Sequence, residues 1–135
     1  VTGPGVICPT AMASINCCKA TNRSLLASSA SRLVTCNSAA VRRLACNCSR
    51  CQKLGSILVF APREAFRLLT DEAALGEYRF NRKVIRHLFC RTCGIESFAF
   101  GELPDGTQMA AVNVNCLDGV EPRSLSPRLV DGRAF

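Results

Sequence analysis

The stretch RRLACNCSRCQKLGS, residues 42–56, places three cysteines within six positions, and HLFCRTCGIES, residues 87–97, adds a second pair. The five cysteines of these two stretches are Cys46, Cys48, Cys51, Cys90 and Cys93. Gaps of one or two residues bring neighbouring sulfurs toward one point, whereas a disulfide partner usually lies further along the chain. The spacing therefore favours thiolates that bind a metal, and zinc is the ion that commonly takes such ligands.

Two arrangements of these sulfurs are compatible with the spacing. In the first, Cys48 and Cys51 join Cys90 and Cys93 in a single closed zinc ribbon with four cysteine ligands, which leaves Cys46 spare. In the second, Cys46, Cys48 and Cys51 hold a zinc of their own and leave its fourth position to water or a substrate thiol, as catalytic zinc sites do. Gly94 fits a knuckle in either case, because glycine lets the backbone turn through positive φ after the second cysteine.

Length and composition indicate one globular domain. The chain has 135 residues, of which 48% are hydrophobic, and no apolar run approaches the roughly 20 residues that span a bilayer. The first residues lack a basic start followed by an apolar stretch, so we expect no secretory signal. The chain has ten cysteines, and metal-ligand spacing among them fits a reducing compartment, so we predict a cytoplasmic protein without membrane contact.

The charge is unevenly distributed. The net charge is +7, and residues 1–63 carry eight Lys or Arg and no carboxylate. Such a half can attract an anionic partner, but a solvated basic surface explains it equally well. The first aromatic residue is Phe60, so no stacking platform interleaves the early basic residues and nucleic-acid binding is disfavoured.

From residue 45 onward the pattern is typical of short β-strands. We expect strands at 56–60, 77–81, 84–90, 96–101 and 109–116, with a further short strand inside 61–70. Between them, Thr70 or Asp71 is placed to cap a helical turn that Gly76 would stop, and Asp105-Gly106 predicts a tight turn. The segment EPRSLSPRL predicts a loop or a single helical turn. Together these elements predict a mainly β domain of short antiparallel strands with zinc knuckles in its turns.

Several motifs, in order, resemble the glutathione-dependent formaldehyde-activating enzyme family. They are the run ACNCSRC, the strand YRF, the knuckle FCRTCG and the segment VNVNCLDG, followed by a final DG. The resemblance runs from Ala45 to about Gly132. It implies a β-tent, or Mss4-like, fold with two zinc sites.

The resemblance also implies roles for the cysteines. The catalytic zinc would lie on Cys46, Cys48 and Cys51, and the structural zinc on Cys90 and Cys93 together with an N-terminal C-x-C-G pair. The present chain has no C-x-C-G pair in that region, and CNSAAVR at 36–42 only echoes it. The candidates to complete the structural site are Cys8, Cys17, Cys18 and Cys36. We therefore divide the chain into an atypical N-terminal segment, 1–44, and a zinc-binding β domain, 45–135.

Other residues have both a functional and a structural interpretation. His87, the one histidine of the chain, is a candidate zinc ligand or general base, but strand alternation also allows a polar face without a role. Cys116 is a candidate spare ligand or simply a buried small side chain. Basic residues around the 79–86 turn are candidates to attract the carboxylates of glutathione or merely to face solvent: Arg79, Arg82, Lys83 and Arg86.

Two functions follow from this pattern. In the first, the protein is a zinc-dependent carbon–sulfur lyase-type enzyme that adds a small thiol, by resemblance glutathione, to formaldehyde or a related aldehyde and so forms an S-hydroxymethyl adduct. In the second, it is a non-catalytic zinc-ribbon module that holds one structural zinc on four cysteines and binds an acidic partner. The sequence leaves the physiological thiol and aldehyde and the oligomeric state open.

Overall fold

Short strands make up most of the regular secondary structure of the computed structural model, which describes residues 13–15, 26–28, 43–68, 71–117 and 120–134. The strands are β1 Ala13–Ile15, β2 Leu26–Ser28, β3 Arg43–Cys46, β4 Leu58–Pro62, β5 Phe66–Leu68, β6 Leu75–Tyr78, β7 Arg86–Cys90, β8 Glu96–Glu102, β9 Gln108–Asn113 and β10 Arg128–Val130. The helical elements are α2 Ser49–Leu54 and the 3₁₀ turns η2 Arg63–Ala65, η3 Glu72–Ala74, η4 Val114–Cys116, η5 Pro122–Ser124 and η6 Gly132–Ala134. Among the described residues, no helix is both long and apolar enough to cross a membrane.

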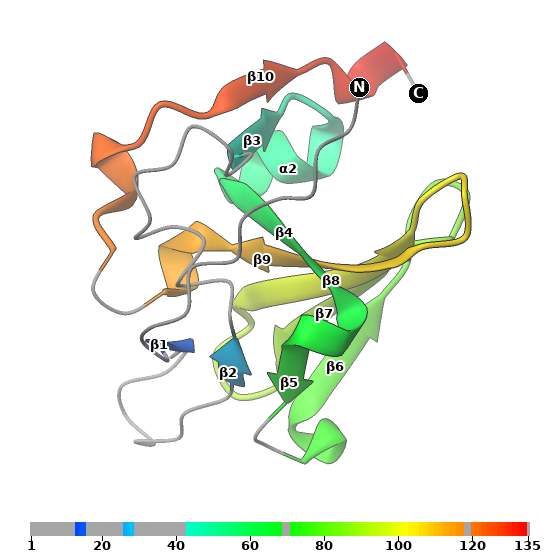
Figure 1. The fold of residues 1–135 in the computed structure, drawn as a ribbon, viewed down its shortest axis with the longest axis vertical. Helices are drawn as coiled ribbons and strands as arrows, with labels where there is room; N and C mark the ends of the chain where they lie inside the picture. The colour runs from blue at the N-terminus through cyan, green and yellow to red at the C-terminus, as the bar shows by residue number, and fades with distance from the viewer. Residues whose placement is uncertain (1–12, 16–25, 29–42, 69–70, 118–119, 135) are drawn as a thin grey trace.

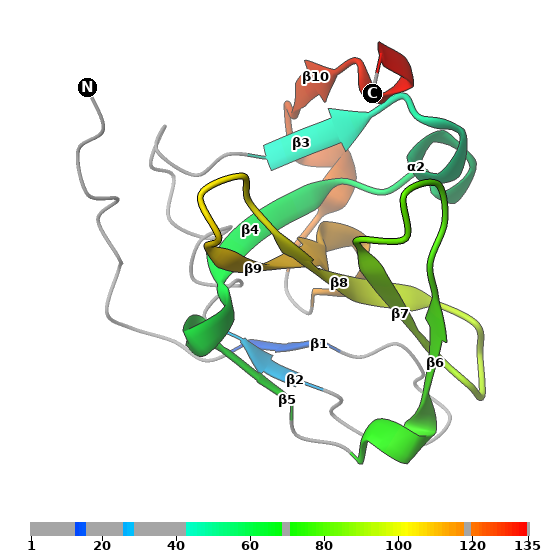
Figure 2. The same ribbon diagram turned by 90° about the vertical axis from the view of Figure 1, so that its right-hand side faces the viewer.

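The strands form one large and one small sheet. The large sheet has seven strands in the order β10-β3-β4-β9-β8-β7-β6, and the small sheet has the order β1-β2-β5. All pairs are antiparallel except β10 with β3, which run parallel. The small sheet and the group of α2, β3 and β10 lie at opposite ends, with the rest of the large sheet between them (Figures 1 and 2). The predicted mainly β, mostly antiparallel fold is confirmed.

The two faces of the large sheet have different roles. Residues that pair directly across strands share a face, and one such row belongs to the buried core: Leu88, Phe98, Val112 and Val59. Phe66 of β5 covers this row, with its ring centroid 4.8 Å from that of Phe98. The next row lies on the opposite face: Tyr78, His87, Ala99, Ala111 and Phe60. Arg50 of α2 contacts Tyr78, so this second face carries the helix that follows the first cysteines.

Most expected elements are present with shifted ends. The strands predicted at 84–90 and 96–101 correspond to β7 and β8, and a single turn, η5, lies in EPRSLSPRL. Asp71 caps η3 by accepting a hydrogen bond from the Ala73 amide at 3.0 Å. The turn at Asp105-Gly106 is closed by a 2.9 Å hydrogen bond from the Gly106 amide to the Leu103 carbonyl.

The role expected for Gly76 is wrong. Gly76 does not stop a helix but lies buried within β6, opposite Phe89. A Cβ at this position would come within 2.3 Å of the Phe89 ring, so only glycine lets the ring lie on the strand. The strand predicted at 77–81 is shifted toward the N-terminus, since β6 begins at Leu75 and ends at Tyr78.

The division of the chain at residue 44 falls inside β3. Most of residues 1–44 lie outside the described residues, so the atypical character of that segment stays a prediction. Cys8, Cys17, Cys18 and Cys36, the candidates for completing a second zinc site, all lie outside as well.

Candidate metal centre

The sulfurs of Cys46, Cys48 and Cys51 converge at one point of the fold. Cys46 ends β3, Cys48 is the N-cap of α2, and Cys51 lies in the first turn of that helix. The three Sγ atoms all lie within 4.8 Å of one another. Sulfurs bound to one tetrahedral zinc at about 2.3 Å lie roughly 3.8 Å apart, so small adjustments bring these three to bonding distance. The triplet therefore fits a zinc ion.

Backbone hydrogen bonds hold the sulfurs in this arrangement. The Cys48 amide donates to Cys46 Sγ and the Cys51 amide donates to Cys48 Sγ, each at 3.4 Å. The helix then ends quickly, because Gly55 adopts a left-handed conformation (φ 60°) and its amide donates back to α2 carbonyls. Amide donors aimed at sulfur stabilise thiolates, which are the form that binds metal.

The pKa values of the Cys48 and Cys51 thiols are shifted in opposite directions. Burial opposes ionisation of Cys48, but hydrogen bonds from the Cys51 amide, the Cys46 thiol and the Arg50 amide together lower its pKa. Burial, followed by the hydrogen bond and charge of Cys48, raises the pKa of Cys51 to about 12. One thiolate forms readily, and three close thiolates require a cation to neutralise them.

The C-terminal residues close the site from the far end of the sequence. β10 pairs with β3, so that Val130 lies beside Cys46, and Gly132 then packs against the cysteines. A Cβ on Gly132 would lie 2.3 Å from Cys46 Sγ and 3.1 Å from Cys48 Cβ. The sulfurs thus lie against bare backbone.

Polar contacts from Asn47 hold this C-terminal segment in place. Its side-chain amide donates to Asp131 at 2.9 Å, and its backbone carbonyl accepts from Arg133 Nε at 3.0 Å. Arg133 also donates to the Gln52 side chain of α2 at 2.6 Å. Asn47 and Gln52, which flank the Cys48–Cys51 stretch, are therefore both held by hydrogen bonds to the C-terminal segment.

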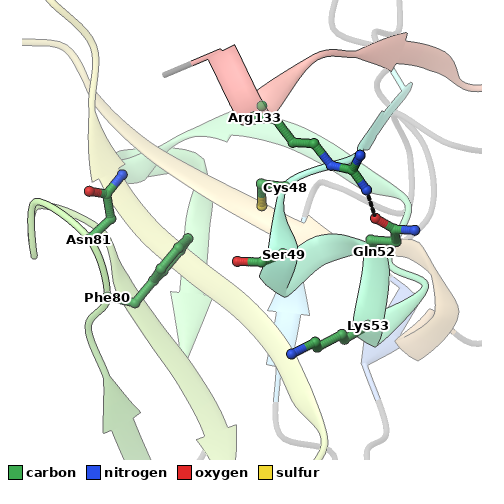
Figure 3. A pocket seen from close by; sticks show the side chains of 8 residues that line it. Cys48, Ser49, Gln52, Lys53, Phe80, Asn81 and Arg133 are labelled. Atoms are coloured by element: carbon green, nitrogen blue, oxygen red, sulfur yellow. Dashed lines mark hydrogen bonds between the residues drawn. The ribbon is translucent and has the colours of Figure 1, made fainter.

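A cavity of about 810 Å³ opens beside the triplet. Its lining residues are Cys48, Ser49, Gln52, Lys53, Phe80, Asn81, Gly132 and Arg133. In Figure 3, α2 forms one wall, Phe80 and Asn81 lie opposite, and the Cys48 sulfur lies between them. The two charged lining residues, Lys53 and Arg133, are both cations, so the cavity favours an anionic ligand.

The structure places the second cysteine pair apart from the triplet. Cys90 is buried at the end of β7, and Cys93 is exposed in the turn before β8. The turn is the expected knuckle, since Gly94 has φ +74° and its amide donates to the Cys90 carbonyl at 2.8 Å. Among the described residues, the one group of three metal-ligand side chains that converges is the Cys46, Cys48 and Cys51 triplet.

His87 and Cys116 also lie outside that group. Cys116 is buried in the core, where burial raises the pKa of its thiol to about 11. His87 is buried as well, and its ring contacts Glu96 rather than the triplet. Alternation allowed His87 a polar face without a role; the structure places it buried beside the polar Glu96, and its role stays a prediction.

Sequence reasoning missed the residues that shape the cavity. It offered the basic residues of the 79–86 turn as candidates either to attract anions or to face solvent, and Arg79 and Arg86 form ion pairs with Glu77 at 2.6 and 2.8 Å. Ser49, Gln52 and Lys53 have the i, i+3, i+4 spacing of one helix face, so recognising α2 would have found them. Arg133 depends on a contact 86 residues away in sequence, and no local pattern predicts it.

Comparison with known proteins identifies the family. The family model described as glutathione-dependent formaldehyde-activating enzyme matches residues 31–131. The chain belongs to this family. It is also similar to a Rhodobacter sphaeroides protein whose crystal structure was determined as a structural-genomics target, with 34% identity over 66% of this chain and 78% of that one, and a TM-score of 0.55. The family match includes both cysteine clusters and β10, and it extends into the segment before residue 45.

Proposed function

We propose that this family member is a zinc-dependent carbon–sulfur lyase-type enzyme that adds a small thiol, such as glutathione, to formaldehyde or a related aldehyde. The observation that carries the proposal is the convergence of three cysteine sulfurs beside a cation-lined cavity. In the forward direction the thiol sulfur bonds to the carbonyl carbon, the carbonyl π electrons move to oxygen, and the thiol proton ends on that oxygen. The product is an S-hydroxymethyl thioether, and the reverse reaction is a carbon–sulfur cleavage.

Cys46, Cys48 and Cys51 would hold the zinc, and three protein ligands leave a fourth position for exchange. A zinc ion held by the three cysteines would act as a Lewis acid and stabilise the substrate thiolate at neutral pH. Three cysteine thiolates leave the zinc site with a net charge of about −1, which opposes an incoming anion. Lys53 and Arg133 offset this charge from the cavity wall, and glutathione offers carboxylates to both.

A second, structural zinc belongs to the same proposal. Cys90 and Cys93 would supply two ligands from the β7–β8 turn, with the other two from the set Cys8, Cys17, Cys18 and Cys36. The converging sulfurs of Cys46, Cys48 and Cys51 suit a metal ion, and metal-binding thiolates support a reducing and therefore cytoplasmic setting for the protein.

The test combines metal content with catalysis. We expect two zinc ions per chain, and we expect glutathione and formaldehyde to exchange with their adduct faster in the presence of protein, measured by NMR exchange spectroscopy. Cys51→Ser should remove one zinc and abolish the acceleration while the thermal unfolding transition persists. Cys116→Ser is the matched control, because that thiol lies outside the triplet, and it should keep both zinc ions.

Two outcomes would contradict the proposal in different ways. A single zinc whose loss in Cys51→Ser unfolds the protein would support one closed structural site. Two zinc ions per chain without any acceleration by the wild-type protein would contradict the proposed thiol–aldehyde reaction but not the proposed metal sites.

A further inference from the structure

His87 is a buried imidazole with one nitrogen engaged and the other without a partner. It lies within β7, is 7% exposed, and its Nδ1 lies 2.7 Å from Glu96 Oε1. Its Nε2 is fully buried, and no hydrogen-bond partner for it exists among the described residues. A buried polar atom in this state usually has a function or a missing ligand. A carboxylate on Nδ1 selects the tautomer with the proton on that nitrogen, which leaves the Nε2 lone pair free to accept a proton.

Glu96 connects this histidine to the helix that carries the cysteines. Its second carboxylate oxygen forms an ion pair with Arg50, which lies between Cys48 and Cys51 in α2. The Arg50 guanidinium also stacks over the Tyr78 ring at 4.5 Å. The two carboxylate oxygens of Glu96 thus join Arg50 of the helix to the His87 ring.

An irregularity in the sheet makes this arrangement possible. The register of β7 against β8 shifts between Leu88 and Phe89, so that Phe89 pairs with Glu96. In regular pairing Glu96 would lie opposite Cys90, on the other face from His87. The bulge therefore turns the Glu96 side chain to the face where His87 and α2 lie.

His87 contacts one of the residues that line the cavity. The Phe80 ring lines the cavity opposite α2 (Figure 3). Its centroid is 5.6 Å from that of the His87 ring. Phe80 follows the end of β6 at the start of an exposed turn, 79–85. Phe80 is therefore the lining residue through which His87 adjoins the cavity.

Apart from Cys48, which the proposed zinc would occupy, the other polar groups around the cavity are poor proton acceptors. Lys53 and Arg133 are cations, and Ser49, Gln52 and Asn81 are not bases at neutral pH. Asp131 is exposed, already accepts hydrogen bonds from Asn47 and the Arg133 amide, and is intrinsically a weaker base than imidazole. The proposed reaction nevertheless requires the thiol to lose a proton before its sulfur bonds to carbon.

We propose that His87 is the acid–base group of this site, an inference that depends on the proposed thiol–aldehyde reaction. The thiol S–H bond breaks, its proton moves to His87 Nε2, and the sulfur remains as thiolate at the triplet. The sulfur then bonds to the aldehyde carbon, the carbonyl π electrons move to oxygen, and His87 returns the same proton to that oxygen. Atoms and charges balance with no further reactant, and Glu96 stabilises the transient imidazolium.

The single histidine makes a direct test possible. We would label the zinc-loaded protein with ¹⁵N-histidine and add glutathione without aldehyde at constant pH. Binding should move the Nε2 resonance from that of an unprotonated nitrogen toward that of an imidazolium. S-methylglutathione is the matched control, because it has the same carboxylates but no thiol proton, and it should bind without this change.

Calorimetry in buffers of different ionisation enthalpy gives a second readout. When glutathione binds, the wild-type protein should release less proton to the buffer than His87→Gln, because the imidazole retains it. His87→Gln should keep its zinc content and slow the exchange by about 100-fold, the usual lower range for loss of a general acid–base group.

The two proposals fail in distinguishable ways. If glutathione binds and exchange is accelerated while the imidazole resonance and the proton release stay unchanged, His87 is not the proton acceptor and only this inference falls. If glutathione, cysteine and 2-mercaptoethanol all fail to bind the zinc-loaded protein, the thiol reaction and the role of His87 fall together.

Discussion

The two cysteine clusters differ in what holds them in place. Cys90 and Cys93 belong to the turn between adjacent strands. The hydrogen bonds that close this turn join residues four or five positions apart in the sequence. The Cys46, Cys48 and Cys51 triplet instead needs β10 beside β3, Gly132 against its sulfurs and Arg133 on its helix. One cluster is defined by local sequence, and the other by contacts more than 80 residues apart.

This difference separates stability from function. A local hairpin turn forms with its strands, so changes near Cys90 should alter the stability of the sheet. The triplet lies at the end of the sheet, where the C-terminal segment can loosen while the core persists. Changes near Gly132 should therefore alter metal affinity and leave the core intact.

The largest effect is expected for Gly132→Ala. The added Cβ would lie 2.3 Å from Cys46 Sγ, so either the sulfur or the C-terminal segment must move. Overpacking of this kind costs about 1–3 kcal/mol, which corresponds to a loss of roughly 5- to 150-fold in zinc affinity. Competition with a chelator measures that affinity. Gly101→Ala is the control, because its Cβ would meet only Ile85 Cγ1 at an ordinary 3.5 Å. Equal zinc affinities for the two variants would contradict a role of Gly132 in holding the sulfurs.

Gly76→Ala should give the opposite result, with lower stability and an unchanged triplet. Its Cβ would come within 2.3 Å of the Phe89 ring, next to the strand that ends at Cys90. We expect a decrease of about 1–3 kcal/mol in the free energy of unfolding, measured in urea. Phe89→Leu in the same chain should recover part of the loss, because the smaller side chain vacates the space. Additive losses in the double variant would show that the ring is not the cause.

The contrast also explains what could be predicted from sequence. The knuckle at Cys90 and the strands after residue 56 follow from local spacing, alternation and glycine, and most are present. The three-cysteine cluster was also recognisable, because its spacing is local. The ring of residues around it was not, since α2 has only six residues and a cysteine as its N-cap, an unusual cap residue.

The environment of His87 was hidden for a related reason. Its partner Glu96 lies nine residues away, within reach of pattern analysis, but regular alternation assigns it to the wrong face. Only the register shift between Leu88 and Phe89 brings the two side chains together. A bulge of this kind depends on how the two strands pair, and no residue of this hairpin predicts it from the sequence.

The smallest effect is expected for Glu77→Gln, on the exposed side of the hairpin that leads to Cys90. Hydrogen bonds from Arg86 and then Arg79 lower the pKa of Glu77 to about 2, so folding favours its charged form. This contribution is fully present above the unfolded pKa near 4.5 and is lost as pH falls through about 2. We therefore expect a small decrease in Tm for the variant at pH 7 that shrinks between pH 4.5 and 2, and that 1 M salt also reduces because the pairs face water. Zinc affinity at the triplet should be identical in both proteins. A change there would mean that the hairpin and the triplet are mechanically coupled, through Arg50 and Glu96, more strongly than their separate supports imply.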